Sequence, residues 1–199
     1  MKEAIGMVLL LGAIGGGVAQ ASVEDVAKGC DACHGPKGVS LSQEIPTIAG
    51  LPAVNLGDQM RTYLEGRPAK RVNHVSGETG KSGDMTEVMK GLSEAQIDAL
   101  ADYYAALPFM PAKQPFDSAK AAVGKALHQA KCEKCHTGGG RNPADESSLL
   151  GGQMKGYMLY SLHEFRQGKR DVDKNMNKAL AAMSEADLEA LAEYYASLQ

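Results

Sequence analysis

The residues with the clearest chemical potential form two short motifs, in each of which a pair of cysteines is followed at once by a histidine. One motif covers Cys30–His34 and the other covers Cys132–His136. Cysteines three positions apart on the start of a helix can form thioether bonds with the two vinyl-derived carbons of one haem, while the adjacent histidine binds the iron. We therefore predict two covalently bound haem c groups. They attach through Cys30 and Cys33 with His34, and through Cys132 and Cys135 with His136.

Other uses of paired cysteines explain less of the sequence. A single Cys-x-x-Cys pair also occurs in redox dithiols and in zinc sites, and four cysteines in an exported chain often form two disulfides. A thioredoxin-like dithiol needs alternating strands and helices, which this sequence does not indicate. Zinc sites would leave two methionines downstream of the motifs without a role. The repetition of the motif favours haem attachment.

The second axial ligand of each iron is predicted from an internal repeat. The segment that begins at Met85 recurs at Met176, and each methionine stands at the same distance before a serine that opens the last helix of its copy. Met89 and Met183 have leucine as their counterparts in the other copy, which indicates packing. We predict that Met85 and Met176 bind the irons opposite the histidines.

The remaining histidines are His74, His128 and His163. His128 precedes its motif and His163 lies beside charged residues within a predicted helix, which favours a solvated or helix-capping role for both. His74 is the rival of Met85 for the first iron. It lies in Arg71–Asp84, a polar segment with glycines that lengthens the interval between histidine and methionine in the first copy.

Hydrophobic spacing predicts an all-α fold. Each copy ends in an amphipathic segment with apolar residues at helical spacing, and Ser93 with Gln96 resembles a capping box at the start of the first. No segment shows the sustained alternation that is typical of a strand. The predicted helices are Val23–Gly29, Leu56–Glu65 and Glu94–Leu107 in the first copy, and Ser118–Lys131, Gly156–Gln167 and Glu185–Leu198 in the second.

A proline-rich segment separates the two copies. Pro108, Pro111 and Pro115 prevent a helix from continuing and favour an extended connector. We therefore predict an N-terminal domain at 22–108, a linker at 109–117 and a C-terminal domain at 118–199. Each domain is small for a self-sufficient apolar core, and a buried haem would supply part of what is missing.

Residues 1–21 have the features of a secretory signal peptide. Lys2 precedes the apolar run Met7–Ile14, and Ala19–Ala21 forms a small-residue cleavage site before Ser22. The apolar run is too short to span a bilayer. We predict a periplasmic protein with no membrane span after cleavage. The formal net charge of −3 excludes a strongly basic nucleic-acid-binding protein.

Several further segments resemble a known family, the dihaem cytochrome c subunit of flavocytochrome c sulfide dehydrogenase, which is itself similar to cytochrome c4. The resemblance covers nearly the whole chain after position 22 and implies two tandem class I cytochrome c domains. It also implies the axial pairs His34/Met85 and His136/Met176. The segments that carry it are Pro46–Gly50, Lys90–Ser93, Pro111–Asp117, Cys132–His136, Ala144–Glu146, Gly152–Gln153 and Phe165–Arg166, continuing to Met176.

The same resemblance implies a partner and a direction of electron flow. The partner is an FAD-containing subunit that oxidises sulfide and forms a heterodimer with this chain. Electrons pass from its flavin to the two haems and then to a small soluble acceptor protein, so the chain is not an enzyme by itself. Two alternatives stay open. One is a free-standing electron shuttle to a terminal oxidase, similar to cytochrome c4, and the other is a dihaem enzyme in which one iron has an open site.

Intact-mass spectrometry of the denatured protein tests the covalent groups and the processing site. We expect a mature chain that begins at or near Ser22 and carries the mass of two haems, because thioether bonds survive denaturation. A mass without two haem additions would remove the basis for electron transfer by this chain. A chain that retains residues 1–21 would contradict only the signal peptide.

Overall fold

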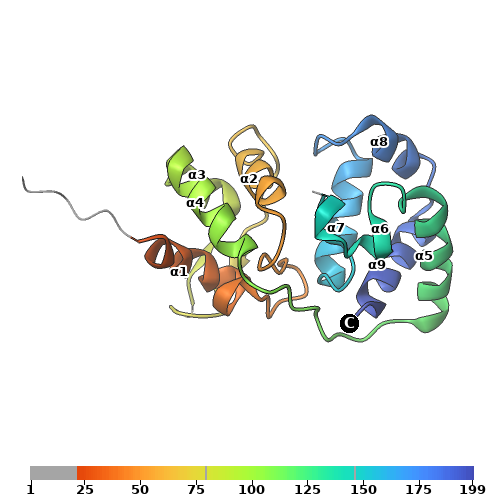
Figure 1. Cartoon of the computed structure of the whole chain (residues 1–199), viewed down its shortest axis with the longest axis horizontal. Coiled ribbons are helices and arrows are strands. Elements are labelled where there is room, and N and C mark those ends of the chain that lie inside the picture. The colour runs from red at the N-terminus through yellow and green to blue at the C-terminus, as the bar shows by residue number, and fades with distance from the viewer. Residues whose placement is uncertain (1–21, 79, 146) are drawn as a thin grey trace, which may run out of the picture.

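Two helical domains lie side by side, joined by an extended segment that runs along the lower edge of the view (Figure 1). The computed structural model describes residues 22–78, 80–145 and 147–199, so the predicted signal peptide at 1–21 lies outside the described residues. The first domain contains α1 (Val23–His34), α2 (Ala53–Arg61), β1 (Val72–Asn73), β2 (Ser82–Gly83), α3 (Met85–Lys90) and α4 (Glu94–Ala105). The second contains α5 (Ser118–Lys131), α6 (Thr137–Gly140), α7 (Lys155–Arg166), α8 (Lys174–Ala181) and α9 (Glu185–Ser197).

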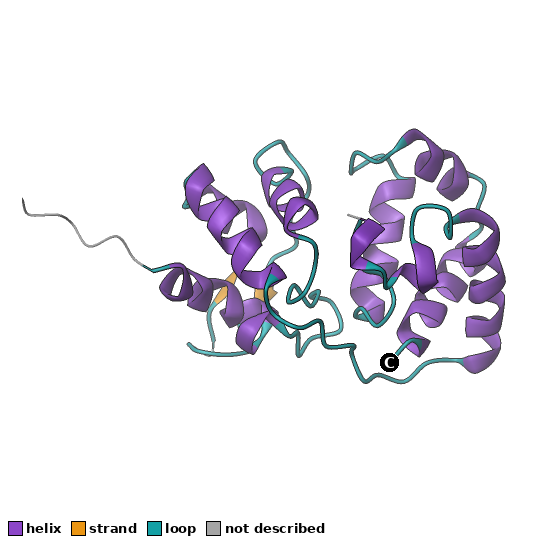
Figure 2. Cartoon of the chain, in the orientation of Figure 1, coloured by secondary structure: helices purple, strands orange, loops and turns teal. Residues whose placement is uncertain are grey.

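The all-α prediction is confirmed, with one local exception. Helices dominate both domains, and a short antiparallel strand pair lies in the first domain (Figure 2). In this pair Val72 lies opposite Gly83, inside the segment that lengthens the first copy. Two-residue strands are too short to produce a visible alternation in the sequence. Within the described residues, no helix is long and apolar enough to cross a membrane.

The first domain is organised around α4, which packs against α1 and α2. The predicted capping box is present: the Ser93 hydroxyl accepts from the Gln96 N–H, and the Gln96 side chain accepts from the Ser93 N–H. These bonds satisfy backbone donors that a helix start leaves free. The helix then buries Ile97, Leu100 and Tyr104 almost completely.

The second domain repeats this arrangement around α9, which packs against α5 and α7. Ser184 and Asp187 form its capping box. The buried side chains of α9 include Leu188, Leu191 and Tyr195. The same element in the same place therefore forms the core of both copies.

The duplication also extends to the backbone of the loop that follows each motif. In the first domain the Ile48 N–H donates to the Gly38 carbonyl at 2.8 Å, and in the second the Leu150 N–H donates to the Gly140 carbonyl at 2.7 Å. Both glycines have positive φ, 71° and 69°. A Cβ on Gly38 would stand 2.8 Å from the ring of Tyr104. Glycine is therefore required where the loop approaches the last helix.

The segment between α4 and α5 is extended and packs onto the second domain. The Ala112 N–H donates to the Gly152 carbonyl at 2.7 Å, and the Gln114 side chain donates to the Gln153 carbonyl at 2.7 Å. Ala112 and Gln114 are both buried. The proline-rich connector is thus part of the folded surface.

A reciprocal pair of buried hydrogen bonds joins the two domains. The Thr47 N–H donates to Gln153 Oε1 at 2.8 Å, and Gln153 Nε2 donates to the Thr47 carbonyl at 2.9 Å. Nearby, the Tyr157 N–H donates to the Gln43 carbonyl at 2.8 Å. One glutamine side chain therefore satisfies both backbone polar groups of a buried residue in the other domain.

We expect Gln153→Ala to destabilise the haem-loaded protein by about 2 to 4 kcal/mol, because it leaves two buried backbone groups of Thr47 unpaired. The measurement is urea unfolding followed by circular dichroism. Gln43→Ala is the matched control, since its exposed side chain lies at the same interface and only its backbone crosses to the other domain. Equal unfolding midpoints for the two variants would show that the side-chain bonds do not hold the domains together.

Candidate haem sites

The first motif occupies the C-terminal end of α1. Cys30 and Cys33 are half-buried and unpaired, and His34 is buried. Burial raises the pKa of Cys30 to about 11, so it is not a reactive thiolate, which argues against a redox dithiol. The predicted place of the cysteines was wrong, because both lie in the last turns of a helix and not at its start.

The His34 imidazole is held in the form that an iron ligand needs. Its Nδ1 lies 2.9 Å from the carbonyl oxygen of Pro46. A carbonyl only accepts, so Nδ1 carries the proton and Nε2 presents its lone pair. Burial lowers the pKa of His34, which keeps the ring neutral. A neutral ring with a fixed tautomer fits axial ligation through Nε2.

The second motif follows α5 directly, with Cys132 as the residue that ends the helix. Cys132 is half-buried and Cys135 is exposed. His136 Nδ1 lies 3.2 Å from the hydroxyl of Ser147, and that hydroxyl donates to the Cys135 carbonyl at 3.1 Å. The serine oxygen is therefore free to accept the Nδ1 proton. Burial lowers the pKa of His136 as well, so the second site repeats the first with a hydroxyl in place of a carbonyl.

Both predicted methionine ligands lie in the first turn of a short helix. Met85 begins α3 after the N-cap Asp84, and Met176 follows the N-cap Asp173 in α8. Both are half-buried. In contrast, Met89 and Met183 are 1% and 9% exposed and belong to the apolar core, so their predicted packing role is confirmed.

His74 lies in the segment that the sequence singled out, and that segment packs against the first motif. The Val75 N–H donates to the Ala32 carbonyl at 2.7 Å, and the Ser76 hydroxyl donates to the Asp31 carbonyl at 2.6 Å. His74 Nδ1 is buried, and it has no hydrogen-bond partner among the described residues. The strand pair therefore places His74 close to the first motif and keeps it as the rival ligand.

The prediction of a solvated or helix-capping His128 was wrong. Its side chain is 0% exposed, because α5 turns it inward between the motif and α9. His163 agrees better with that prediction: its ring is partly exposed and pairs with Glu185 at 2.8 Å. The sequence argument used only the position of His128 before the motif, and that position does not show which face of α5 is buried.

Two arginines that the sequence analysis did not single out meet between the domains. Arg67 stacks on Tyr63 with 4.2 Å between its guanidinium carbon and the ring centroid, and Arg170 stacks on Phe165 at 4.0 Å. Both guanidinium groups donate to the side-chain oxygen of Gln59. A visible signal existed, since a glycine followed by basic residues comes after the second helix of each copy.

These arginines test whether the chain fits haem. Both are buried, and among the described residues neither forms an ion pair; the arginines that do are others. Arg67 Nε and Arg170 Nη1 have no hydrogen-bond partner in the described part of the chain. A buried cation with an unfilled donor calls for an anion. Haem carries two propionate carboxylates, so these side chains fit the group that the motifs imply.

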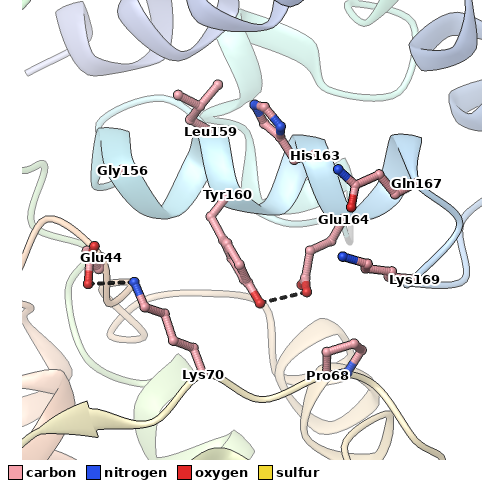
Figure 3. Close-up of a pocket in the computed structure, with 10 residues that line it drawn as sticks. All are labelled: Glu44, Pro68, Lys70, Gly156, Leu159, Tyr160, His163, Glu164, Gln167 and Lys169. Atoms are coloured by element: carbon pink, nitrogen blue, oxygen red, sulfur yellow. Dashed lines mark hydrogen bonds and ion pairs between the residues drawn. The ribbon is translucent and has the colours of Figure 1, made fainter.

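A surface groove of about 570 Å³ also lies between the domains. On one side of the groove the Tyr160 hydroxyl donates to Glu164, one turn along α7, and on the other side Lys70 pairs with Glu44 (Figure 3). The groove contains none of the motif cysteines, motif histidines or predicted methionine ligands. It is therefore distinct from the candidate haem sites.

Two copies of one helical module, each with a Cys-x-x-Cys-His motif, define a tandem haem-carrying protein of the c type. The chain belongs to the cytochrome c family, whose model matches residues 22–107 and 121–199. The prediction of two tandem cytochrome c domains is thereby confirmed, and the family implies covalently bound haem c.

Similarity to known proteins extends over both domains. The chain is 31% identical to the thiosulfate dehydrogenase electron acceptor of Thiomonas intermedia (strain K12), over 86% of this chain and 79% of that protein. The crystal structure of reduced recombinant cytochrome c4 from Pseudomonas stutzeri matches with a TM-score of 0.72 and 28% identity, over 90% of this chain and 100% of that one. The structure of thiosulfate dehydrogenase from Marichromatium purpuratum matches with a TM-score of 0.67 and 26% identity, over 84% of this chain and 36% of that one.

These similarities establish a dihaem, cytochrome c4-like electron-transfer chain, which is the coarser part of the resemblance found in the sequence. They cover both motifs and both sets of packed helices. The particular partner belongs to the proposal below.

We expect Met176→Ala to reduce the sulfur–iron charge-transfer absorption of the oxidised, haem-loaded protein to about half, because one of two sulfur ligands is lost. The potential of the second haem should fall. Met183→Ala is the control, since it removes a buried methionine of the same domain. Met85→Ala should remove the other half of the band. An unchanged band in Met85→Ala, together with conversion of the first haem to a high-spin state in His74→Ala, would show that His74 binds the first iron.

Proposed function

We propose that the chain is a dihaem electron carrier in which Cys30 and Cys33, and likewise Cys132 and Cys135, attach one haem each. His34 with Met85, and His136 with Met176, are the axial pairs. The observation that carries this proposal is the tautomer of the histidines: each Nδ1 faces an acceptor, so each Nε2 is left for iron. The recurrence of one methionine position supports it.

The residues of this chain hold and tune the cofactor. Each bound haem supplies iron that gains and loses one electron. A histidine and a methionine on each iron would leave no position for a substrate, so the haem-loaded chain would transfer electrons without making bonds. Methionine as a ligand favours the reduced iron and raises the potential relative to two histidines. The buried positive charges of Arg67 and Arg170 would stabilise haem propionates.

The proposed mature protein consists of a domain at 22–108, a linker at 109–117 and a domain at 118–199. The predicted signal peptide supports export to the periplasm. The haem c motifs agree with such a location, because free cysteines in an exported protein are otherwise expected to form disulfides.

The first proposed electron donor is an FAD-containing sulfide dehydrogenase subunit, as the sequence resemblance implies. Sulfide gives up electrons in pairs and each haem accepts one, so a flavin that takes the pair and releases single electrons matches the two stoichiometries. Two haems on one chain can hold both electrons. A small soluble protein would then be the acceptor.

A thiosulfate dehydrogenase is the second candidate donor. It is favoured by the 31% identity to a protein named as the electron acceptor of that enzyme. It is also favoured by the match to a solved thiosulfate dehydrogenase chain, of which this chain covers 36%. Both candidates oxidise a reduced sulfur compound and deliver electrons to a dihaem chain, so the proposed role of this protein is the same in either case.

Stopped-flow reduction of the purified, oxidised chain distinguishes the donors. We expect slow reduction by sulfide or thiosulfate alone, because the proposed axial pairs would leave neither iron open to these anions. Addition of an equimolar amount of the cognate dehydrogenase should make haem reduction at least about tenfold faster with its own substrate. If the flavoprotein is the donor, reduction should become faster only with sulfide. If the thiosulfate dehydrogenase is the donor, it should become faster only with thiosulfate.

Two outcomes would favour the alternatives. Equal rates with and without either dehydrogenase would leave a free-standing shuttle to a terminal oxidase. Rapid, tight cyanide binding by one haem in an optical titration would indicate an open iron and hence a dihaem enzyme. Size-exclusion chromatography of the mixture tests whether the flavoprotein forms a stable heterodimer with this chain.

A further inference from the structure

A buried histidine lies between a carboxylate and a phenol beside the second motif. His128 Nε2 lies 2.6 Å from Glu133 Oε2, and His128 Nδ1 lies 3.0 Å from the Tyr195 hydroxyl. The histidine side chain is fully buried, whereas that of Glu133 is 42% exposed. Since Glu133 is the first residue between the two motif cysteines, this chain of hydrogen bonds begins in solvent and ends inside the haem domain.

The first domain has no histidine in the corresponding series of hydrogen bonds. Its equivalent tyrosine, Tyr104, donates directly to Asp31 at 2.8 Å and also to the Ala27 carbonyl at 3.0 Å. When the motifs are aligned at their first cysteines, Val26 occupies the position of His128. Histidine is thus inserted between phenol and carboxylate in the second copy alone.

The surroundings of His128 accommodate both of its charge states. In the neutral ring, Nε2–H donates to Glu133 and Nδ1 accepts from the Tyr195 hydroxyl. In the charged ring, both nitrogens donate and the Tyr195 oxygen accepts. A hydrogen bond from the Gly138 N–H at 2.9 Å, followed by His128 itself, lowers the pKa of Glu133 and keeps it ionised.

The titratable and charged groups around the ring come from two elements. From α9, Tyr194 and Tyr195 pack on the imidazole with centroid distances of 5.4 and 5.5 Å, and burial raises the pKa of both phenols. The motif supplies Glu133, Cys132 and His136. After burial, the charge of His128 is the next cause that lowers the pKa of His136. Charge on His128 is therefore felt at the proposed iron ligand, although the two rings share no hydrogen bond.

We propose that His128 takes up a proton from solvent when the second haem is reduced. The electron comes from the donor protein and changes Fe(III) to Fe(II), and one proton from bulk water adds to His128 Nδ1. That nitrogen then donates to Tyr195, and Glu133 provides the counter-charge. The site gains one electron and one proton, so its net charge is unchanged. This inference rests on the proposed second haem.

The expected sign follows from the charges. Ferric iron carries one more positive charge than ferrous iron and disfavours a cation nearby, so reduction strengthens proton binding at His128. Rising pH withdraws that proton and makes the second haem harder to reduce. We expect proton affinity to differ about tenfold between the redox states, which lowers the midpoint potential by about 59 mV in total across the transition.

Potentiometric titration of the haem-loaded full chain from about pH 5 to about pH 8 tests the proposal. The second haem, identified by the shift that Met176→Ala produces, should show the fall in potential. The first haem is an internal control and should stay flat, because its tyrosine bonds directly to Asp31. His128→Gln should abolish the fall, whereas His163→Gln should retain it, since His163 of α7 is partly exposed and pairs with Glu185 at the start of α9.

Nuclear magnetic resonance of the unmodified chain keeps the test independent of folding of the variants. The His128 ring should titrate at higher pH in the reduced protein than in the oxidised protein, which a purely structural histidine would not do. Equal titration in both redox states, or the same fall in potential in His128→Gln, would overturn the proposal. A chain that lacks the second haem by mass would instead overturn the proposed function.

Discussion

Each candidate haem site depends on one hydrogen bond, the bond that engages Nδ1 of the motif histidine. In the first domain the acceptor is the carbonyl of Pro46, and in the second it is the hydroxyl of Ser147. The bond determines which nitrogen is left for iron, and it also attaches the loop after the motif to the motif itself. That loop is held in turn by the last helix, because the Gly50 and Gly152 N–H groups donate to the carbonyls of Tyr104 and Tyr195. The orientation of the ligand is therefore part of the packing of the whole domain.

The contact between the domains adds what neither copy has alone. Gln153 satisfies a buried peptide of the first domain, and Gln59 accepts from an arginine of each domain. Two buried guanidinium groups with unfilled donors are costly without an anion. Their cost is offset if the cofactors bring carboxylates to the same place. In that case, cofactor binding and domain association would be linked by charge.

Much of this arrangement was predictable from the sequence because it is repeated. The capping serines, the final helices and the packing role of Met89 follow from local spacing, and Ser118–Lys131 was predicted with its observed bounds. Other features depend on contacts between distant residues. The buried state of His128 requires Tyr195, and the meeting of Arg67 with Arg170 requires both domains. The strand pair around His74 is too short to produce a periodic signal. The metal ligands themselves stay predictions until a spectrum tests them.

The extended segment between α4 and α5 has a mechanical consequence. Its backbone and side chains are bonded into the second domain at Ala112 and Gln114, so it cannot act as a slack tether. The two domains should tumble in solution as one rigid particle, so that amide groups in both report the same rotational diffusion. Two or three glycines inserted at this point would therefore do more than lengthen the linker. They would disrupt the hydrogen bonds of Ala112 and Gln114 to the second domain and allow the two domains to move relative to each other.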